Sequence, residues 1–207
     1  MSKGLAAEKI IFGEVAEIYC PFLGRVNSII QGQKYTIISR RQFDSILEKD
    51  PGRGHEIYWN EMLGRVHQAS AATLIRQYRW IRGMVLSIKS YSYLPYAACA
   101  RGFLESAADS FSTLGCVPGA LADNFPQIKS AITGQFEGGF FSNEDLENKL
   151  IHFTHARKLE KDEEKIVPPS HKAETMRRYI DELQNSQIHD YYAFLCNITH
   201  PAAYSVA

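Results

Sequence analysis

Apolar residues recur at intervals of three and four along most of the chain beyond residue 55. This spacing places them on one face of an α-helix. The pattern predicts a long helix from Ile57 to Ile88, with a looser join at residues 68–72. Further helices are predicted over residues 96–114, 121–132, 142–159, 171–183 and 188–199. The fold class that follows is all-α, a helical bundle of five to seven helices.

Proline residues interrupt the pattern at two places. Pro126 predicts a kink in the helix over residues 121–132. Pro168 and Pro169 separate the last two helices from a mixed charge run at residues 160–165. We interpret that run as a solvated linker, with a partner-binding tail as the alternative.

The first 54 residues follow a different pattern. Lys34–Ser39 is rich in β-branched residues and follows a turn-like stretch, which favours a short strand or an extended segment. Residues 41–48 have helical spacing, and one proline and two glycines at residues 50–54 end that helix. We therefore predict an irregular N-terminal extension over residues 1–54 and an α-helical bundle domain over residues 55–207.

Composition and charge are those of a soluble globular protein. The chain is 45% hydrophobic, which is ample for a core, and 23 Lys and Arg balance 23 Asp and Glu. This balance gives no global signature of binding to nucleic acid or to an anionic membrane. No targeting segment and no membrane-spanning run of about 18 apolar residues is evident. Four widely spaced cysteines without a CxxC pattern indicate reduced thiols, so we predict a cytoplasmic location.

Arg101 and Glu105 are the first candidates for chemistry. At positions i and i+4 they share one helix face, in a stretch of alanine and phenylalanine that leaves little room for solvent. A guanidinium has five donors, and Glu105 satisfies part of them. The remaining donors of Arg101 are available to a carbonyl, a carboxylate or a phosphate. The pair is thus either part of a site or a buried ion pair that fixes helix register.

The segment Asn197-Ile-Thr-His200-Pro201 holds the second group of candidates. Pro201 stops the last helix directly after His200, where the imidazole is placed to act as a C-terminal cap or to make a buried hydrogen bond. His200 is also our candidate for the third partner of Arg101 and Glu105. Asn197, one turn earlier, is a candidate binding residue. A role for His200 as general acid–base needs a substrate nearby.

These two segments together carry a family resemblance. A helix with Arg101-x-x-x-Glu105, followed about a hundred residues later by an aromatic helix ending in His200-Pro201, resembles a group of uncharacterised bacterial helical proteins. It is similar, more distantly, to the HEPN superfamily of helical domains over residues 55–202. Many HEPN members are metal-independent endoribonucleases with an Arg-x(4–6)-His motif on one helix, usually across a dimer interface.

The chain departs from that motif, because no arginine stands at residues 193–196 before His200. In space, Arg101 would have to take its place. The resemblance therefore implies an RNA- or protein-interaction module. The alternatives are a metal-independent endoribonuclease, with His200 as acid–base group and Arg101 stabilising phosphate charge, and a purely structural or assembly module.

A basic stretch supports an anionic partner. Residues 62–104 contain no Asp or Glu, and Arg76, Arg79 and Arg82 recur every three residues among aromatic side chains. Basic and aromatic groups on one face suit RNA, through phosphate contacts and base stacking. The alternative is the solvated side of a helix that pairs with the acidic segment at residues 144–164.

Other site classes have little support in the sequence. His152 with His155, and Cys196 with His200, form pairs at helical spacing, whereas structural zinc needs four ligands, so no metal site is predicted. The glycines at residues 134–139 lack the context of a phosphate-binding loop, and no cofactor is predicted. Phe140-Phe141 and the aromatic face of the last helix suit either a homodimer contact or the core.

Overall fold

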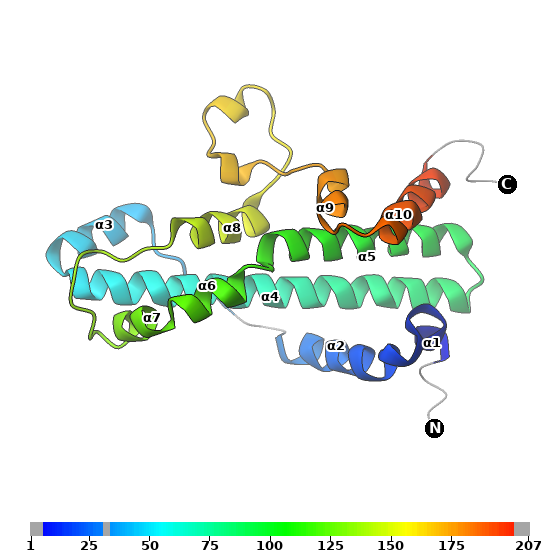
Figure 1. The fold of residues 1–207 in the computed structure, drawn as a ribbon, viewed down its shortest axis with the longest axis horizontal. Coiled ribbons are helices and arrows are strands. Elements are labelled where there is room, and N and C mark those ends of the chain that lie inside the picture. Colours follow the sequence, from blue (N-terminus) through cyan, green and yellow to red (C-terminus); the bar gives the residue numbers. More distant parts are fainter. Residues whose placement is uncertain (1–5, 31–33, 201–207) are drawn as a thin grey trace. The chain divides into compact units, whose positions relative to one another are not determined.

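The computed structural model describes residues 6–30 and 34–200, and Pro201 of the predicted His-Pro motif lies outside these ranges (Figure 1). The all-α class is confirmed: the described residues form ten α-helices and no strand. This is more than the five to seven predicted, because several predicted segments divide into short helices. The helices are α1 (Ala6–Phe12), α2 (Ala16–Ile30), α3 (Arg40–Lys49), α4 (Pro51–Lys89), α5 (Tyr93–Leu114), α6 (Val117–Asp123), α7 (Phe125–Ile132), α8 (Glu144–His155), α9 (Met176–Glu182) and α10 (Ser186–Thr199). Three 3₁₀ turns, at Gly13–Val15, Glu163–Lys165 and Pro169–His171, complete the regular structure.

Most of the described N-terminal residues are helical, so the extension is more regular than predicted, and the helix predicted over residues 41–48 is confirmed as α3. Helices α1, α2 and α3 occupy most of this region, and α2 continues through Pro21. The segment at residues 34–39, predicted as a short strand or an extended segment, has no regular secondary structure, so the strand alternative is wrong. Its β-branched residues have no neighbouring strand with which to pair, and β-propensity without such a partner does not form a sheet.

Helix α4 runs without interruption from Pro51 to Lys89. The proline that ends α3 is also the first residue of α4, a position where its missing N–H costs nothing. A Cβ atom at Gly54 would lie 2.6 Å from Leu47 Cδ1, so the glycine lets α3 approach α4 closely. The boundary predicted between residues 54 and 55 falls inside this helix.

Several helix ends differ from those predicted. Residues 121–132 do not form one kinked helix, because Asn124 separates α6 from α7 and Pro126 lies in the first turn of α7. The side chain of Asn143 caps α8, and that of Thr175 caps α9. In each case a side-chain oxygen accepts a free backbone N–H of the first turn.

The chain forms two compact units. The first comprises the described parts of residues 1–32, 71–112 and 174–207, and the second comprises the described parts of residues 33–70 and 113–173. Helix α4 contributes its first half to the second unit and its second half to the first. Each unit has its own apolar core.

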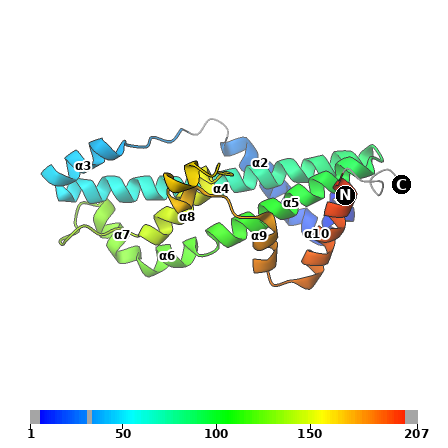
Figure 2. The same cartoon turned by 90° about the horizontal axis from the view of Figure 1, so that it is seen from above.

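In the first unit, α4 and α5 form an antiparallel pair, with α10 against α5 and α1 and α2 against α4 (Figure 1, Figure 2). Glycines bring α4 and α5 together: a Cβ at Gly83 would lie 2.5 Å from Cys99 Sγ, and one at Gly102 would lie 2.7 Å from the Trp80 ring. The buried core joins α1, α2, α4, α5 and α10 through Ala7, Leu23, Ile81, Met84, Val85, Ala97, Ala100, Leu195 and Ile198.

The second unit packs around Trp59, which is fully buried on α4. Trp59 Nε1 donates to Phe141 O at 3.1 Å, and Phe141 N donates to His55 Nε2 at 2.8 Å. His55 is itself buried between the rings of Phe136 and Phe140. These contacts hold the segment before α8 against α4. They give Phe140 and Phe141 a place in this unit's packing, one of the two roles that the sequence left open.

Candidate functional site

Arg101 and Glu105 lie on α5 and form an ion pair. Arg101 Nε donates to Glu105 Oε1 at 2.8 Å, and this hydrogen bond raises the pKa of the guanidinium. The side chains are 39% and 24% exposed, respectively. The pair is therefore half-buried, and part of the Arg101 side chain faces solvent.

Two residues of α10 contact this pair. Arg101 Nη1 donates to Thr199 Oγ1 at 3.2 Å, and the Tyr192 hydroxyl donates to Glu105 Oε1 at 2.9 Å. Burial and the hydrogen bond to Glu105 raise the pKa of Tyr192, which keeps its hydroxyl a donor. We name Arg101, Glu105, Tyr192 and Thr199 the polar cluster. The sequence suggested His200 for the place that Thr199 and Tyr192 take.

His200 ends α10 through its backbone. Its N–H donates to Cys196 O at 3.0 Å, and its extended backbone (φ −73°, ψ 140°) leaves the helix. The imidazole is exposed, and its nitrogens make no hydrogen bond or ion pair with the part of the chain that the structure describes. Asn197 is also exposed. Both residues face solvent, and in the sequence both lie within two positions of Thr199 of the polar cluster.

The three regularly spaced arginines differ in their surroundings. Arg76 Nη1 donates to Asp109 Oδ2 of α5 at 3.0 Å. Arg79 and Arg82 are exposed, and the Arg82 guanidinium lies 5.8 Å from the centre of the Tyr78 ring. The acidic segment at residues 144–164, suggested as a partner for this face, belongs to the other unit.

Arg79, Arg82 and Lys89 share one face of α4. Their positions, with exposed Leu86 between them, follow the 3-4-3 spacing of a single helix stripe. Within residues 6–30 and 34–200, none of the three has a carboxylate at ion-pair distance. We name these three cations the α4 basic stripe. Arg82 and Lys89 also line a cleft of about 310 Å³ between α2 and α4, which contains one carboxylate, that of Glu8.

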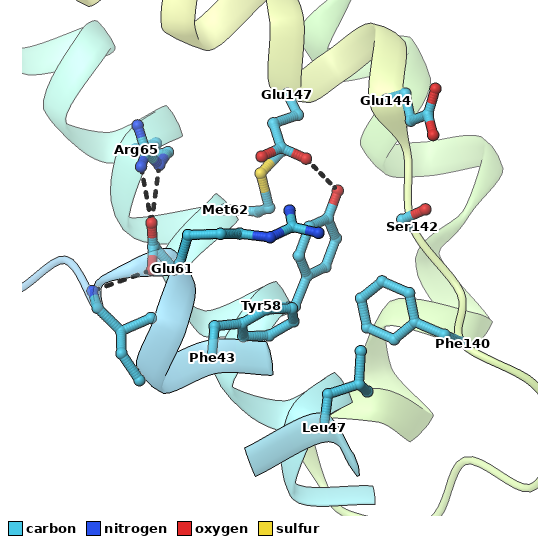
Figure 3. Close-up of a pocket in the computed structure, with 12 residues that line it drawn as sticks. Phe43, Leu47, Tyr58, Glu61, Met62, Arg65, Phe140, Ser142, Glu144 and Glu147 are labelled. Atoms are coloured by element: carbon cyan, nitrogen blue, oxygen red, sulfur yellow. Dashed lines mark hydrogen bonds and ion pairs between the residues drawn. The ribbon is translucent and has the colours of Figure 1, made fainter. Parts of the chain in front are cut away.

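A larger cleft, of about 460 Å³, lies in the second unit (Figure 3). Its walls come from α3, α4, the segment before α8 and the first turn of α8. We name it the aromatic cleft, and it is lined by Ile38, Arg40, Phe43, Leu47, Tyr58, Glu61, Met62, Arg65, Phe140, Ser142, Glu144 and Glu147. Sequence reasoning missed it, because its residues are spread over more than a hundred positions.

Tyr58 is the central polar group of the aromatic cleft. Its hydroxyl donates to Glu147 Oε2 at 3.2 Å and accepts the backbone N–H of Asn143 at 3.2 Å. Burial raises the pKa of Tyr58 to about 12, and the negative charges of Glu147 and Glu144 act in the same direction. The hydroxyl therefore stays protonated and links α4 to the start of α8.

The histidines that the sequence suggested as a metal-binding pair contact other groups instead. His152 Nδ1 lies 3.1 Å from Ser170 O, and the rings of His155 and His171 are 6.0 Å apart. Among the residues that the structure describes, no three His, Cys, Asp or Glu side chains are grouped to hold a metal ion. In the same residues, no helix is long and apolar enough to cross a membrane.

Comparisons with protein-family models, with curated proteins and with solved structures give no match for this chain. Its function is therefore inferred from the chemistry of its own side chains. Three features carry that chemistry: the polar cluster, the α4 basic stripe and the aromatic cleft.

Proposed function

We propose that the first unit is an RNA-binding module of HEPN-like type, which binds single-stranded RNA through the α4 basic stripe. One observation carries the proposal. Arg79, Arg82 and Lys89 lie on one exposed helix face, and no carboxylate of the described residues neutralises any of them. Their charge is thus available to an anionic partner.

The spacing of the stripe suits an extended polyanion. Residues 79 and 89 are ten positions apart, which is about 15 Å along a helix axis. Cations in a row contact successive phosphates and release the counterions condensed on the strand. Residues 62–104, which include the stripe, contain no Asp or Glu, and Glu8 is the acidic residue that lines the adjoining cleft.

Aromatic groups next to the stripe favour RNA over a simple anion. The Tyr78 ring lies under the Arg82 guanidinium, and Tyr91, just past the end of α4, is 96% exposed. Tyr78 is half-buried, whereas the exposed ring of Tyr91 provides a stacking platform for an unpaired base. The resemblance of Arg101-x-x-x-Glu105 and His200-Pro201 to HEPN-like domains points to the same class of ligand.

The test is equilibrium binding of a fluorescent 12-nucleotide RNA, followed by anisotropy in buffer of about 100 mM salt. The triple variant Arg79→Gln/Arg82→Gln/Lys89→Gln should bind about 10-fold more weakly or worse, because three phosphate contacts are lost. Arg177→Gln is the matched control. Arg177 is an exposed arginine of the same unit whose charge is balanced by Asp181, 3.9 Å away.

The control should bind as the parent chain does. RNA binding that survives the triple substitution would overturn the proposal. Binding of polyglutamate with the same dependence on the three cations, and no binding of RNA, would assign the stripe to an acidic protein partner instead.

Endoribonuclease activity is the second candidate, and one contact favours it. The hydrogen bond from Arg101 to Thr199 fixes the residue directly before His200 next to the guanidinium. An imidazole and a guanidinium near one phosphate are the groups that metal-independent cleavage needs. The test is RNA cleavage in EDTA, with Arg101→Ala and His200→Ala as variants. Activity that neither variant lowers would exclude this candidate.

We also propose a cytoplasmic location and a homodimer. All four cysteines are free thiols, as a reducing compartment requires. Tyr191 and Phe194 on α10 are 41% and 52% exposed, and an aromatic pair of this kind suits a contact between two copies. Light scattering coupled to size-exclusion chromatography tests the dimer, with Phe194→Ser expected to yield monomers.

A further inference from the structure

Some charged side chains of the aromatic cleft form ion pairs with a group of opposite charge, and others do not. Arg65 donates to Glu61 Oε1 through Nε and Nη2, at 3.1 and 2.7 Å. Both side chains are largely buried, and Glu61 Oε2 accepts the backbone N–H of Ile38. Arg40, at the surface, pairs with Asp44 at 2.9 Å. Both cations of the cleft thus have a carboxylate partner.

The two carboxylates of α8 that line the cleft, those of Glu144 and Glu147, have no such partner. Among the described residues, the one hydrogen-bond donor to Glu147 Oε2 is the Tyr58 hydroxyl, a neutral group toward which the carboxylate points (Figure 3). Glu144 lies at the rim, one turn earlier. No lysine, arginine or histidine nitrogen in the described residues lies within ion-pair distance of either one. Their joint charge reaches the cleft interior, since both raise the pKa of Tyr58.

Three rings stand together beside these carboxylates. The ring centres of Tyr58 and Phe140 are 5.4 Å apart, those of Phe43 and Phe140 are 5.9 Å apart, and those of Phe43 and Tyr58 are 6.4 Å apart. Phe140 is 42% exposed although it belongs to this group, so part of its side chain is accessible. The Arg40 guanidinium already lies 5.9 Å from the centre of the Phe43 ring, which shows that a cation fits against this wall.

We propose that the aromatic cleft binds an organic cation, with the ammonium or guanidinium group at Glu147 and the apolar part against Phe140, Tyr58 and Phe43. Aromatic faces attract cations through their quadrupole, and a carboxylate supplies a charge-assisted hydrogen bond. The cleft volume of about 460 Å³ is in the range of small-molecule sites. The ligand is either a free amine or the Lys or Arg side chain of another protein.

Helix geometry alone accounts for only part of this arrangement. Carboxylates in a first turn interact favourably with the helix dipole, which explains an acidic start of α8 at Glu144, Asp145 and Glu147. It does not explain why Glu147 shares a cleft with three rings and bonds to a buried tyrosine. Asp145 is exposed on the same turn and does not line the cleft, so it is a matched control.

The experiment titrates the 207-residue chain with phenethylammonium and follows binding by calorimetry and by the chemical shifts of Phe140 and Tyr58. Two near-isosteric probes, 2-phenylethanol and phenylacetate, test the charge. We expect phenethylammonium to bind at least about 10-fold more tightly than either, because only it pairs with Glu147. Equal binding of the alcohol, or no saturable binding of the amine at millimolar concentration, would overturn the proposal.

Variants of opposite charge provide a second test. Glu147→Gln keeps the hydrogen bond from Tyr58 and should weaken binding of the amine about 10-fold. Arg40→Gln removes a competing cation and should strengthen it. Asp145→Asn should change neither affinity nor fold. Because general damage to the cleft would weaken binding in every variant, a tighter Arg40→Gln variant supports the site, and a weaker one contradicts it.

A third comparison identifies the source of the cation. Agmatine represents a free amine, and the capped tripeptide Gly-Arg-Gly presents the same guanidinium on a peptide. Tighter binding of agmatine supports a small-molecule site, and tighter binding of the peptide supports recognition of a protein side chain. If neither competes with phenethylammonium, the guanidinium part of the proposal is wrong and the site is limited to ammonium groups.

Discussion

Glu105 Oε1 is the atom that decides what the polar cluster can do. It accepts hydrogen bonds from both Arg101 Nε and the Tyr192 hydroxyl. An oxygen that is engaged twice is poorly placed to take a proton from a substrate. We therefore propose that Glu105 is a positioning residue, because its hydrogen bonds orient the Arg101 guanidinium and join α5 to α10.

The half-exposed state of this pair limits its effect on stability. We expect Glu105→Gln to lower the free energy of unfolding by about 0.5–1 kcal/mol. His200→Ala should change it by less than about 0.5 kcal/mol, because the imidazole is exposed. Urea unfolding of the two variants measures this. A loss of several kcal/mol in His200→Ala would mean that the imidazole is part of the packing after all.

The pKa of Tyr58 should lie well above that of an ordinary tyrosine. Its pKa is raised from 10.0 to about 12, so the unfolded chain loses this proton first as the pH rises. The stability that the neutral hydroxyl contributes is complete below pH 10 and is lost as the pH rises toward 12. The absorbance at 295 nm of the parent chain minus that of Tyr58→Phe should have a midpoint near 12. A midpoint near 10 would contradict the buried hydrogen bond to Glu147.

At the element scale, the sequence predicted the long helices and α3 well and missed α1 and α2. The helices α4, α5 and α10 carry sustained apolar spacing, which is enough to identify them. The segment at residues 34–39 has β-branched residues but no partner strand, so its propensity has no effect. A proline at a first helical turn looks the same in sequence as a proline that ends a helix, as Pro51 illustrates.

Candidate sites were predictable only where one helix carries them. Arg101 and Glu105 form a pair because i and i+4 positions always meet on a helix. The partners from α10 depend on helix packing, so Thr199 and Tyr192 were not identified. The aromatic cleft joins residues from α3, α4 and α8, and no local spacing of residues in the sequence predicts such a site.

Gly102, where α4 and α5 approach closely, and Gly24 on α2 should respond differently to substitution by alanine. A Cβ at Gly102 would meet the Trp80 ring at 2.7 Å, whereas a Cβ at Gly24 on α2 would make an ordinary contact of 3.8 Å with Tyr78. We expect Gly102→Ala to destabilise the first unit by about 1–3 kcal/mol through overpacking. Gly24→Ala should stabilise it by about 0.5–1 kcal/mol, because alanine favours the helix. Thermal unfolding of both variants checks the sign, and a stabilised Gly102→Ala chain would refute the close packing.

At the scale of the whole molecule, the two units have separate cores. We therefore expect a core substitution in one unit to destabilise that unit and not the other. Leu150 is fully buried in the core of the second unit. Leu150→Ala should cost about 2–5 kcal/mol there. Amide hydrogen exchange should become faster in α6, α7 and α8 and stay unchanged in α9 and α10. Uniformly faster exchange would show that the chain unfolds as one cooperative body.

The central claim is that the α4 basic stripe binds RNA through phosphate contacts, and salt dependence tests it most directly. For single strands the logarithm of the binding constant falls with the logarithm of salt concentration by about 0.7 per phosphate contact. The triple variant Arg79→Gln/Arg82→Gln/Lys89→Gln should therefore reduce this slope by about 2 relative to the parent chain. An identical slope in parent and variant would contradict the claim.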